Sequence, residues 1–278
     1  MIDKNQSRNP YHAIAEPPRF LSSVCLYMDM LGYKEMWWQA ERDGSQVTFL
    51  HRLYEALEEG QDWLFPNDSD VWPTEKDRYA IKAFTDNIVI GWPVRGDAES
   101  ELGSIFSNIA YFQLRLATRG FFLRGAIALG DAYVDDVVVL GSAFLEAVQG
   151  EAQAKNPRII LTDTATAAVK RHLTYYSQSD QAPQYSDLYQ DSDGKWFVNY
   201  LETILAAGED CPFFKELEKH KHNITQRLKE FRSDSRIQAK YIWAANYHNF
   251  FCDQRPRHFL DYKIDIEPET SFRRIGQS

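Results

Sequence analysis

The stretch LYMDMLGYKEMWW, from Leu26 to Trp38, decides the fold, because it joins an apolar strand to a helix through one carboxylate. Residues 20–29 read FLSSVCLYMD, which is typical of a buried strand ending on Asp29, and a helix is expected from about Tyr33. Burying a lone carboxylate is costly unless a cation meets it. Asp29 therefore either caps the helix that follows or faces a metal or a basic partner.

The elements expected on either side of this stretch predict an α+β fold. The first helix runs over 33–58, with an interruption expected at Asp43-Gly44, and a loop covers 60–77. RYAIKAFTDNIVIGWP, residues 78–93, is a hairpin that turns at Thr85-Asp86-Asn87. Further along we expect a helix ending near Gly120 and then two strands within 121–141 that break at Gly130-Asp131. A helix over 141–154 and a strand over 158–161 follow. The main domain ends with a helix over 162–173, a polar stretch over 177–194 and a strand over 196–201. This order predicts a ferredoxin-like core with a mixed sheet and flanking helices.

The C-terminal part of the chain has a different pattern. Apolar residues from Phe214 to Phe231, and again from Ile237 to Phe251, recur at helical spacing. We expect an antiparallel helical pair that packs on the main domain or on a second copy. The predicted organisation is thus an N-terminal arm over 1–19, a main domain over 20–205 and a helical extension with a tail over 206–278.

Composition limits the possible functions. The 278 residues carry a net charge of −9, which is unusual for a nucleic-acid binder because phosphate backbones attract basic surfaces. The three cysteines, Cys25, Cys211 and Cys252, form no CxxC pair, so neither a disulfide framework nor a zinc knuckle is expected. The N-terminus lacks an apolar signal core and no run of about 18 apolar residues occurs, so we expect a cytoplasmic protein without a membrane span.

Asp29 and Asp86 are the carboxylates most suited to chemistry. In a ferredoxin-like sheet the first strand lies beside the central hairpin, so the end of that strand and the hairpin tip can reach one point. Their carboxylates, with the backbone carbonyl of Met30, would form an oxygen site for Mg²⁺ or Mn²⁺, and phosphate oxygens would complete the coordination. The alternative is that Asp29 caps a helix and Asp86 is an ordinary turn acid, and spacing alone leaves both open.

Four ordered segments resemble the catalytic domain of the class III nucleotidyl cyclases. DMLGYKE at 29–35 is similar to the D-[IM]-x-G-[FY] motif that opens this domain, and KAFTDNIVIG at 82–91 resembles its second metal motif. RGAIALGDAY at 124–133 and VLGSAFLEAVQGEAQAKNPRIIL at 139–161 resemble its later elements. KYIWAANYHNFF at 240–251 is similar to a segment of the pyrimidine cyclases in bacterial Pycsar anti-phage systems, which extends the resemblance over nearly the whole chain.

The resemblance implies a homodimer with active sites at the subunit interface. Each site would bind a nucleoside triphosphate and a pair of Mg²⁺ or Mn²⁺ ions, held by Asp29, Asp86 and the Met30 carbonyl. The 3′-hydroxyl of the nucleotide would attack its own α-phosphate and expel pyrophosphate. The positions implied to contact the substrate are Gly32, Tyr33, Lys82 and Arg124.

Two of the basic residues have a structural alternative. Arg124 could supply charge to the phosphates, or it could be a strand-edge arginine paired with a surface acid. Lys195 stands near the position of a phosphate-binding lysine in the family, although a solvated loop lysine is more typical there.

Departures from the family pattern bear on the substrate. Purine cyclases read the base with an acid or Thr where this chain has Val138, and they hold the ribose and the transition state with Asn and Arg where it has Leu145 and Gln149. Lys82 stands where adenylate cyclases of the family have a lysine that contacts the base. The resemblance therefore favours a pyrimidine cyclase that converts UTP, before CTP, to cyclic UMP or cyclic CMP and so signals to a separate effector in anti-phage defence.

Three other interpretations stay open. An adenylate or guanylate cyclase could read its base differently, and a catalytically inactive cyclase-like domain could bind only nucleotide or a protein partner. A plain α+β interaction domain would match the motifs by chance. Retention of both Asp29 and Asp86 speaks against the inactive domain.

Histidine and aromatic positions elsewhere are expected to be structural. His220 and His222 stand two residues apart, so a helix would point them in different directions on a solvated face. Tyr247-His248-Asn249 is expected to pack against a neighbouring subunit, and Trp37-Trp38 to fill the core or an interface.

Overall fold

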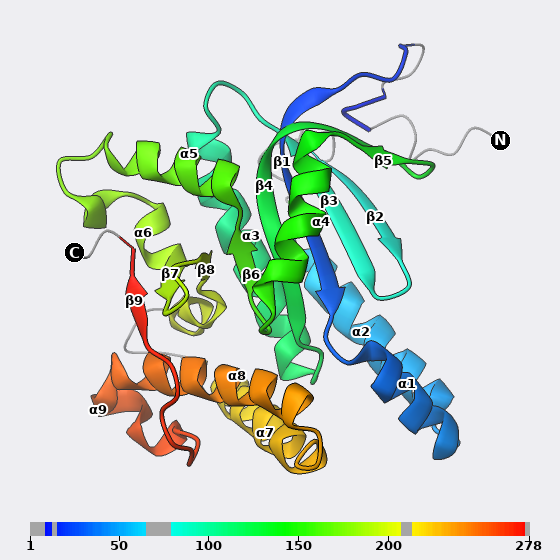
Figure 1. Ribbon diagram of the computed structural model, residues 1–278, viewed down its shortest axis with the longest axis vertical. Coiled ribbons are helices and arrows are strands. Elements are labelled where there is room, and N and C mark those ends of the chain that lie inside the picture. Colours follow the sequence, from blue (N-terminus) through cyan, green and yellow to red (C-terminus); the bar gives the residue numbers. More distant parts are fainter. Residues whose placement is uncertain (1–8, 13–15, 65–78, 207–212, 276–278) are drawn as a thin grey trace.

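The protein, described here by a computed structural model over residues 9–12, 16–64, 79–206 and 213–275, is built on a nine-stranded sheet. The strand order is β2-β3-β1-β4-β6-β8-β7-β9, with β5 paired to β4 (Figure 1). The strands are β1 (Leu21–Met30), β2 (Ala80–Phe84), β3 (Asn87–Pro93), β4 (Leu123–Val134), β5 (Val139–Leu140), β6 (Ile159–Leu161), β7 (Leu188–Asp191), β8 (Trp196–Val198) and β9 (Phe272–Arg274). The α-helices are α1 (Tyr33–Arg42), α2 (Gln46–Leu64), α3 (Glu99–Thr118), α4 (Ser142–Ala154), α5 (Asp163–Leu173), α6 (Gln184–Asp187), α7 (Phe214–Glu230), α8 (Ser235–Asp253) and α9 (Pro256–Phe259). In these described ranges no helix is both long and apolar enough to cross a membrane.

The first four strands form the ferredoxin-like core that the sequence predicts. β1 lies between β3 and β4 and is antiparallel to both, while β2 and β3 form the expected hairpin. β6 joins β4 in parallel, so the sheet is mixed. The predicted fold class, an α+β arrangement with a mixed sheet, flanking helices and a C-terminal helical pair, is confirmed.

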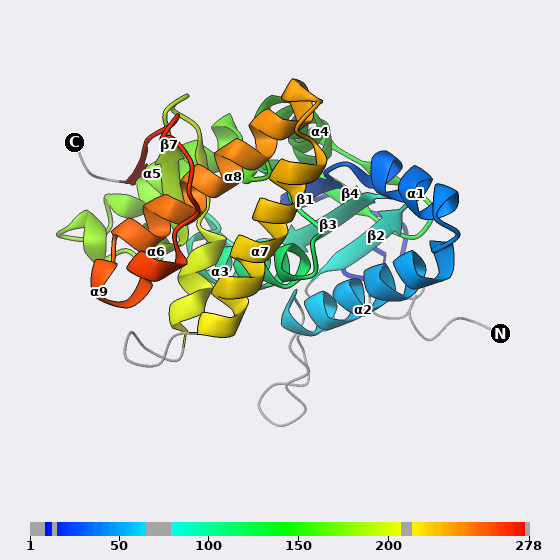
Figure 2. The same ribbon diagram turned by 90° about the horizontal axis from the view of Figure 1, so that it is seen from below.

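Alternation along β1 gives the sheet two buried faces. Val24 and Leu26 belong to the core shared with α2, α3 and the C-terminal helices, while Cys25 belongs to a smaller cluster under α4. Figures 1 and 2 show α4 on one face of the sheet and α2 and α3 on the other. Gly150 lets α4 lie close against β4, because a Cβ at this position would stand 2.6 Å from the Cβ of Ala126.

The helices α7 and α8 form the predicted pair and lie across the end of the sheet at which β1 finishes (Figures 1 and 2). The Tyr241 ring stacks on Phe231, with 5.8 Å between ring centroids, and meets Phe122 edge-on at 5.5 Å. Asn223 Nδ2 donates to the Ala117 carbonyl of α3 at 2.9 Å. The tail then returns to the sheet, where β9 pairs with β7. The pair therefore packs on its own main domain.

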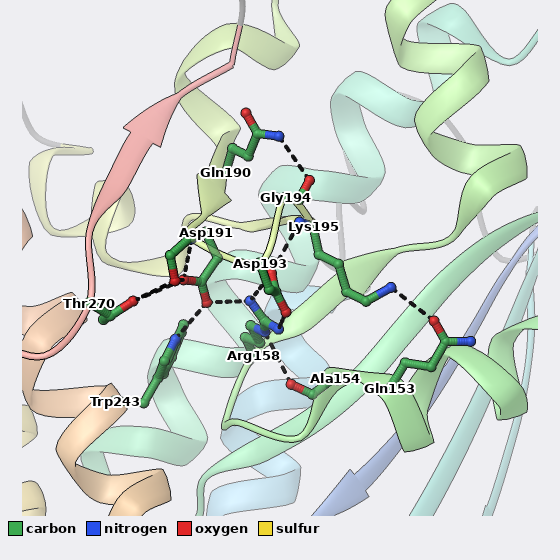
Figure 3. A network of polar contacts seen from close by, with 11 residues as sticks. Gln153, Ala154, Arg158, Gln190, Asp191, Asp193, Gly194, Lys195, Trp243 and Thr270 are labelled. Carbon is green, nitrogen blue, oxygen red and sulfur yellow. Dashed lines mark hydrogen bonds and ion pairs between the residues drawn. The ribbon is translucent and has the colours of Figure 1, made fainter.

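A buried polar network joins the segment after α4 to β7 and α8 (Figure 3). Arg158, whose side chain is 1% exposed, contacts Asp191 and Asp193, and its Nε donates to the Ala154 carbonyl at 3.1 Å. Trp243 Nε1 donates to the same Asp191 carboxylate at 2.7 Å. The tryptophan of the KYIWAANYHNFF segment thus fastens α8 to the sheet.

Two buried histidines join α7 to α8, and the predicted solvated face at His220 is wrong, since its side chain is fully buried. The Nδ1 atoms of His220 and His248 lie 2.9 Å apart. At the ends of this pair, His248 Nε2 lies 3.0 Å from the Tyr262 carbonyl and His220 Nε2 lies 2.8 Å from the Tyr200 hydroxyl. Burial lowers the pKa of both histidines, which favours neutral rings. A carbonyl can only accept, so a neutral His248 donates to Tyr262 and accepts from His220. The Tyr200 hydroxyl then donates to His220, and both imidazoles are neutral.

Several predicted boundaries differ from the structure. β4 runs through Gly130 without a break, and the interruption comes at 135–138, where Asp135 Oδ1 accepts from the backbone N–H groups of Val137 and Val138. α2 continues to Leu64, and the rest of the predicted loop, Cys211 and much of the N-terminal arm lie outside the described residues. β4 therefore ends at the turn over 135–138, where the Asp135 side chain accepts from two backbone N–H groups, and Gly130 does not end it.

Three segments of polar or aromatic residues also depart from expectation. The polar stretch over 177–194 contains β7, which is paired to β8 and β9. The Tyr247 hydroxyl donates to Asn199 Oδ1 at 2.8 Å, so this segment packs inside its own chain and not against a neighbouring subunit. Trp37 and Trp38 are 38% and 52% exposed, so they do not fill the core, and the other half of the prediction, that they fill an interface, stays a prediction.

Candidate active site

The end of β1 and the tip of the β2–β3 hairpin border a pocket of about 350 Å³. Both predicted acids and the turn into α1 are among its lining residues, which are Tyr27, Asp29, Met30, Gly32, Tyr33, Lys34, Glu35, Asp86, Asn87 and Glu151. The structure therefore brings together five of the residues singled out in the sequence, from segments more than fifty positions apart.

Backbone pairing sets the two acids side by side. Asp29 stands opposite Asn87 in the β1–β3 register, next to Asp86 in the hairpin turn. The Met30 N–H donates to the Asp86 carbonyl at 3.1 Å, which ties the end of β1 to that turn. Backbone pairing thus holds the main chain of the two acids side by side.

Asp29 does not cap the helix that follows it. The N-cap position of α1 is Gly32, which has a φ of 73° and makes no side-chain hydrogen bond. Glycine takes this left-handed conformation without the steric cost of a Cβ. Asp86 does lie in the turn, where its Oδ1 accepts from Asn87 Nδ2 at 3.3 Å, and it also lines the pocket. The capping alternative is therefore excluded for Asp29.

Arg124 and Glu151 lie behind Asp29. Arg124 stands directly opposite Asp29 in the β1–β4 register, and its Nη2 donates to Asp29 Oδ2 at 3.0 Å. The same nitrogen contacts Glu151 on α4. Both carboxylates are mostly buried, 22% and 12% exposed, so this is not a surface ion pair. The sequence reasoning missed Glu151, whose one signal was its place in the segment over 139–161.

The charges in the pocket favour a bound cation. Burial, followed by the neighbouring Asp86 carboxyl, raises the pKa of Asp29 to about 6, although Arg124 acts in the opposite direction. Two carboxylates in one half-buried pocket repel each other, and a divalent cation between them would replace that repulsion with attraction.

The donor set fits Mg²⁺ or Mn²⁺. Asp29, Asp86 and the backbone of Met30 offer oxygen ligands, which these hard cations prefer. In the described part of the chain no group of three or more His, Cys, Asp or Glu side chains forms a metal site, so side chains alone would not complete the coordination. The remaining positions would go to water and to substrate phosphates.

The basic residues lie in different places. Lys82 donates to the Val137 carbonyl at 2.7 Å and does not line the acidic pocket. Lys195 donates to Gln153 at 2.8 Å, at the edge of the network in Figure 3. Lys240 on α8, which the sequence reasoning did not single out, lies within electrostatic range of Asp29.

Comparisons with known proteins give distant likenesses. A scan against models of protein families finds no match, and a search of curated proteins finds none either. Among solved structures, the catalytic core of a rhodopsin-guanylyl cyclase with converted specificity, in complex with ATPαS, matches over 64% of this chain and 96% of that one, with 13% identity and a TM-score of 0.39. A bacterial light-regulated adenylyl cyclase matches over 76% of this chain and 59% of that one, with 11% identity and a TM-score of 0.41.

A third structure, a class III adenylyl cyclase-like ATP-binding protein from Pseudomonas aeruginosa, matches over 55% of this chain and 37% of that one, with 10% identity and a TM-score of 0.37. Similarity at this level does not specify an activity. The function has to be argued from the side chains of this chain.

Proposed function

We propose that this protein is a nucleotidyl cyclase of the class III type, which converts a nucleoside triphosphate to its 3′,5′-cyclic monophosphate and pyrophosphate. The observation that carries the proposal is the meeting of Asp29 and Asp86 in one pocket, at the positions where the sequence resembles the two metal motifs of that family. The cyclase domain would span 20–205, with the arm over 1–19 and the extension over 206–278.

The proposed reaction forms a bond between the ribose 3′-oxygen and the α-phosphorus, breaks the bond to the leaving pyrophosphate, and releases the hydroxyl proton to water. A pair of Mg²⁺ or Mn²⁺ ions held by Asp29, Asp86 and the Met30 carbonyl would lower the pKa of the hydroxyl and neutralise phosphate charge. The task of the chain is then to hold the nucleotide in line. Gly32 and Tyr33 at the start of α1 are placed to offer backbone N–H groups to the phosphates.

In this proposal Arg124 is a positioning residue. Its hydrogen bond to Asp29 and its contact with Glu151 restrict the Asp29 side chain before substrate binds. The Nη2 atom of Arg124 faces both carboxylates, and Arg124 is not among the residues that line the pocket. We therefore place Arg124 behind Asp29 rather than on the triphosphate.

We propose a pyrimidine triphosphate, UTP before CTP, as the substrate. Val138, next to β5, and Leu145 on α4 occupy the positions from which purine cyclases hold the base and the ribose, and neither side chain can form a hydrogen bond. Lys82 donates to the carbonyl of Val137, the residue before Val138. Of the two positions with which purine cyclases recognise the base, one is therefore a lysine here and the other is apolar. Lys82 is also the observation that keeps adenylate or guanylate cyclase activity as the second candidate.

We propose that two chains pair around each active site. Four exposed apolar side chains, here called the apolar ridge, lie on the turn before β5, on β5 and on α4, and they are Val137, Val138, Leu140 and Leu145. A gathering of exposed apolar side chains is typical of an interface. The hydrogen bond from Lys82 ties the ridge to β2, the strand that leads to Asp86. A partner that covers the ridge would therefore stand beside the acidic pocket.

The biological role follows from the resemblance to the Pycsar cyclases. Cyclic UMP or cyclic CMP would be a second messenger that activates a separate effector during phage infection. The effector would meet this protein only through the product.

The test is a direct assay of product. The purified protein is incubated with ATP, GTP, CTP or UTP in the presence of Mn²⁺, and products are resolved by chromatography and mass spectrometry. We expect cyclic UMP or cyclic CMP, absent with Asp86→Asn. Cyclic AMP or cyclic GMP would retain the cyclase and reject the pyrimidine substrate. No product from any of the four nucleotides would reject catalysis and favour a domain that only binds nucleotide or a protein partner.

A further inference from the structure

The N-terminal half of α8 lies next to the turn that leaves β1. The Tyr241 ring meets Phe122 edge-on at 5.5 Å between centroids. Phe122 directly precedes β4, and its carbonyl accepts from the Leu31 N–H at 2.8 Å. Figures 1 and 2 show α8 passing across this end of the sheet. Two contacts therefore link α8 to the residues that follow Asp29.

Lys240, the residue before Tyr241, brings positive charge to this place. Its side chain is partly buried and lies within electrostatic range of Asp29 and Glu35, with Arg124 and Arg236 as neighbouring cations. In the described part of the chain the Lys240 ammonium has no hydrogen-bond or ion-pair partner, and its electrostatic partners are the groups just named. An ammonium held in a partly buried position without a direct partner is costly, and an anion at the pocket would relieve that cost.

Among the described residues that line the pocket only Lys34 is cationic, and Lys240 reaches toward the pocket from outside that lining. A triphosphate carries roughly four negative charges at neutral pH, and the metal ions of the proposed function would offset much of that charge, so a further cation would act on the leaving phosphates. Arg124 already contacts Asp29 and Glu151. Lys34 is exposed at the rim. A lysine ammonium suits the leaving phosphates because it acts as a compact point charge with three donors.

We propose that Lys240 binds the β- and γ-phosphates of the substrate, so that the C-terminal helical pair completes each active site. This inference deepens the proposed cyclase function and rests on it. α8 is a suitable support because Trp243, one turn further along, is fixed to Asp191 at 2.7 Å. A helix held in this way positions a side chain more firmly than a loop does. The extension over 206–278 then contributes to substrate binding as well as to stability.

The experiment compares Lys240→Met with Lys240→Arg and with Lys215→Met, a matched loss of charge at an exposed lysine on α7. Calorimetry measures the Kd of inorganic tripolyphosphate in the presence of Mn²⁺, and steady-state kinetics give KM and kcat for the nucleotide that is turned over. We expect Lys240→Met to weaken tripolyphosphate about tenfold or more and to raise KM in parallel, since one charge-assisted contact is lost. Lys240→Arg should stay within about threefold of the wild type, because it retains the charge. Lys215→Met should change nothing.

Each contrary result has a distinct meaning. If Lys240→Met leaves both turnover and tripolyphosphate affinity unchanged, this inference is wrong while the proposed function stands. A lowered Tm with unchanged affinity would make Lys240 a structural residue and overturn it as well. A wild-type chain that neither binds tripolyphosphate nor converts any of the four nucleotides would overturn the proposed function, and this inference with it.

Discussion

Asp29 stands at the end of a strand whose preceding residues are mostly buried, and it meets Asp86, Arg124 and Glu151 at one place. Folding brings two carboxylates together here at a cost, because burial and the like charge both disfavour ionisation. A site that is strained without its ligand is typical of a position selected for binding rather than for stability.

Replacing one acid should therefore stabilise the protein while it abolishes metal binding. We expect Asp29→Asn, without added metal at neutral pH, to raise the free energy of unfolding by roughly 2 kcal/mol, because the raised pKa of Asp29 marks a penalty for its charge. Saturating Mn²⁺ should raise the stability of the wild type by roughly 2 to 3 kcal/mol and leave the variant unchanged. Thermal melts with and without Mn²⁺ measure both effects.

Asp131→Asn is the matched control, because Asp131 is an exposed aspartate on β4, away from the pocket. It should alter neither the melt nor the response to Mn²⁺. An Asp29→Asn variant that still gained stability from Mn²⁺ would contradict the metal site.

A second prediction at the residue scale concerns Trp243. Trp243→Phe removes the N–H that donates to buried Asp191 and part of a ring that lies 5.7 Å over the Arg158 guanidinium. We expect a loss of roughly 2 to 4 kcal/mol in the free energy of unfolding, from the lost hydrogen bond to a buried carboxylate that keeps Arg158 at that oxygen, and from a small cavity. Urea denaturation followed by circular dichroism measures it. Trp38→Phe, at a residue 52% exposed on α1, should cost almost nothing, and an equal cost at both sites would refute the role given to the network.

At the scale of elements, α7 and α8 are held together by an unusual contact between His220 and His248. Burial lowers the pKa of His248 to about 4, and burial together with its partner lowers the pKa of His220 well below the ordinary value of 6.5. A proton added to either ring would place a positive charge in the buried interior, and a charge on one ring disfavours a charge on the other.

Acid should therefore loosen this helical pair. As the pH falls below 6.5 the unfolded chain binds protons that the folded chain does not, so the contribution is fully present above 6.5 and is lost toward pH 4. The loss is about 1.4 kcal/mol per pH unit for each histidine. We expect His248→Gln to give a shallower dependence of unfolding free energy on pH, measured by urea denaturation between neutral and mildly acidic pH.

His222→Gln provides the comparison, because His222 lies on the same helix with its side chain exposed. Its slope should match that of the wild type. A His248→Gln variant with an unchanged slope would show that the buried pair does not govern acid sensitivity.

At the scale of the whole molecule, the apolar ridge is uncovered, and the hydrogen bond from Lys82 to the Val137 carbonyl joins it to β2. Leu140 and Leu145 are 51% and 62% exposed, although the core nearby is closely packed. The proposed dimer gives these side chains a partner and places the second chain next to the site.

We expect the wild type to have twice the mass of one chain by light scattering and Leu140→Asp combined with Leu145→Asp to be a monomer without cyclase activity. Each buried charge would cost several kcal/mol at the interface. The control is Leu260→Asp, which changes a leucine that is 59% exposed on the C-terminal side. The melting temperature of the monomeric double variant should stay close to that of this control. A wild type that is monomeric at assay concentrations and still active would rule out a shared site.

The sequence by itself determined most of the core elements and singled out the two acids, but it did not indicate β7 or β9. The apolar run in FLSSVCLYMD and helical spacing in the C-terminal runs are local patterns, so they predicted β1, α7 and α8. The ferredoxin-like order then implied that Asp29 and Asp86 meet, because β1 has to lie beside the hairpin. Local patterns do not report contacts between distant segments, which is why the exact end of β4 and the burial of His220 were missed.

Only the tertiary structure decided what surrounds the acids. Glu151 reaches Arg124 because Gly150 lets α4 lie close to β4, and Lys240 reaches the same end of the sheet because Tyr241 packs on Phe122. No sequence spacing indicates that Glu151 contacts Arg124 or that Lys240 lies near Asp29, because each depends on how one element packs on another. The two acids can therefore be identified from the sequence. The residues that pair with their charge depend on how the helices pack on the sheet, and that packing results from many weak contacts over the whole fold.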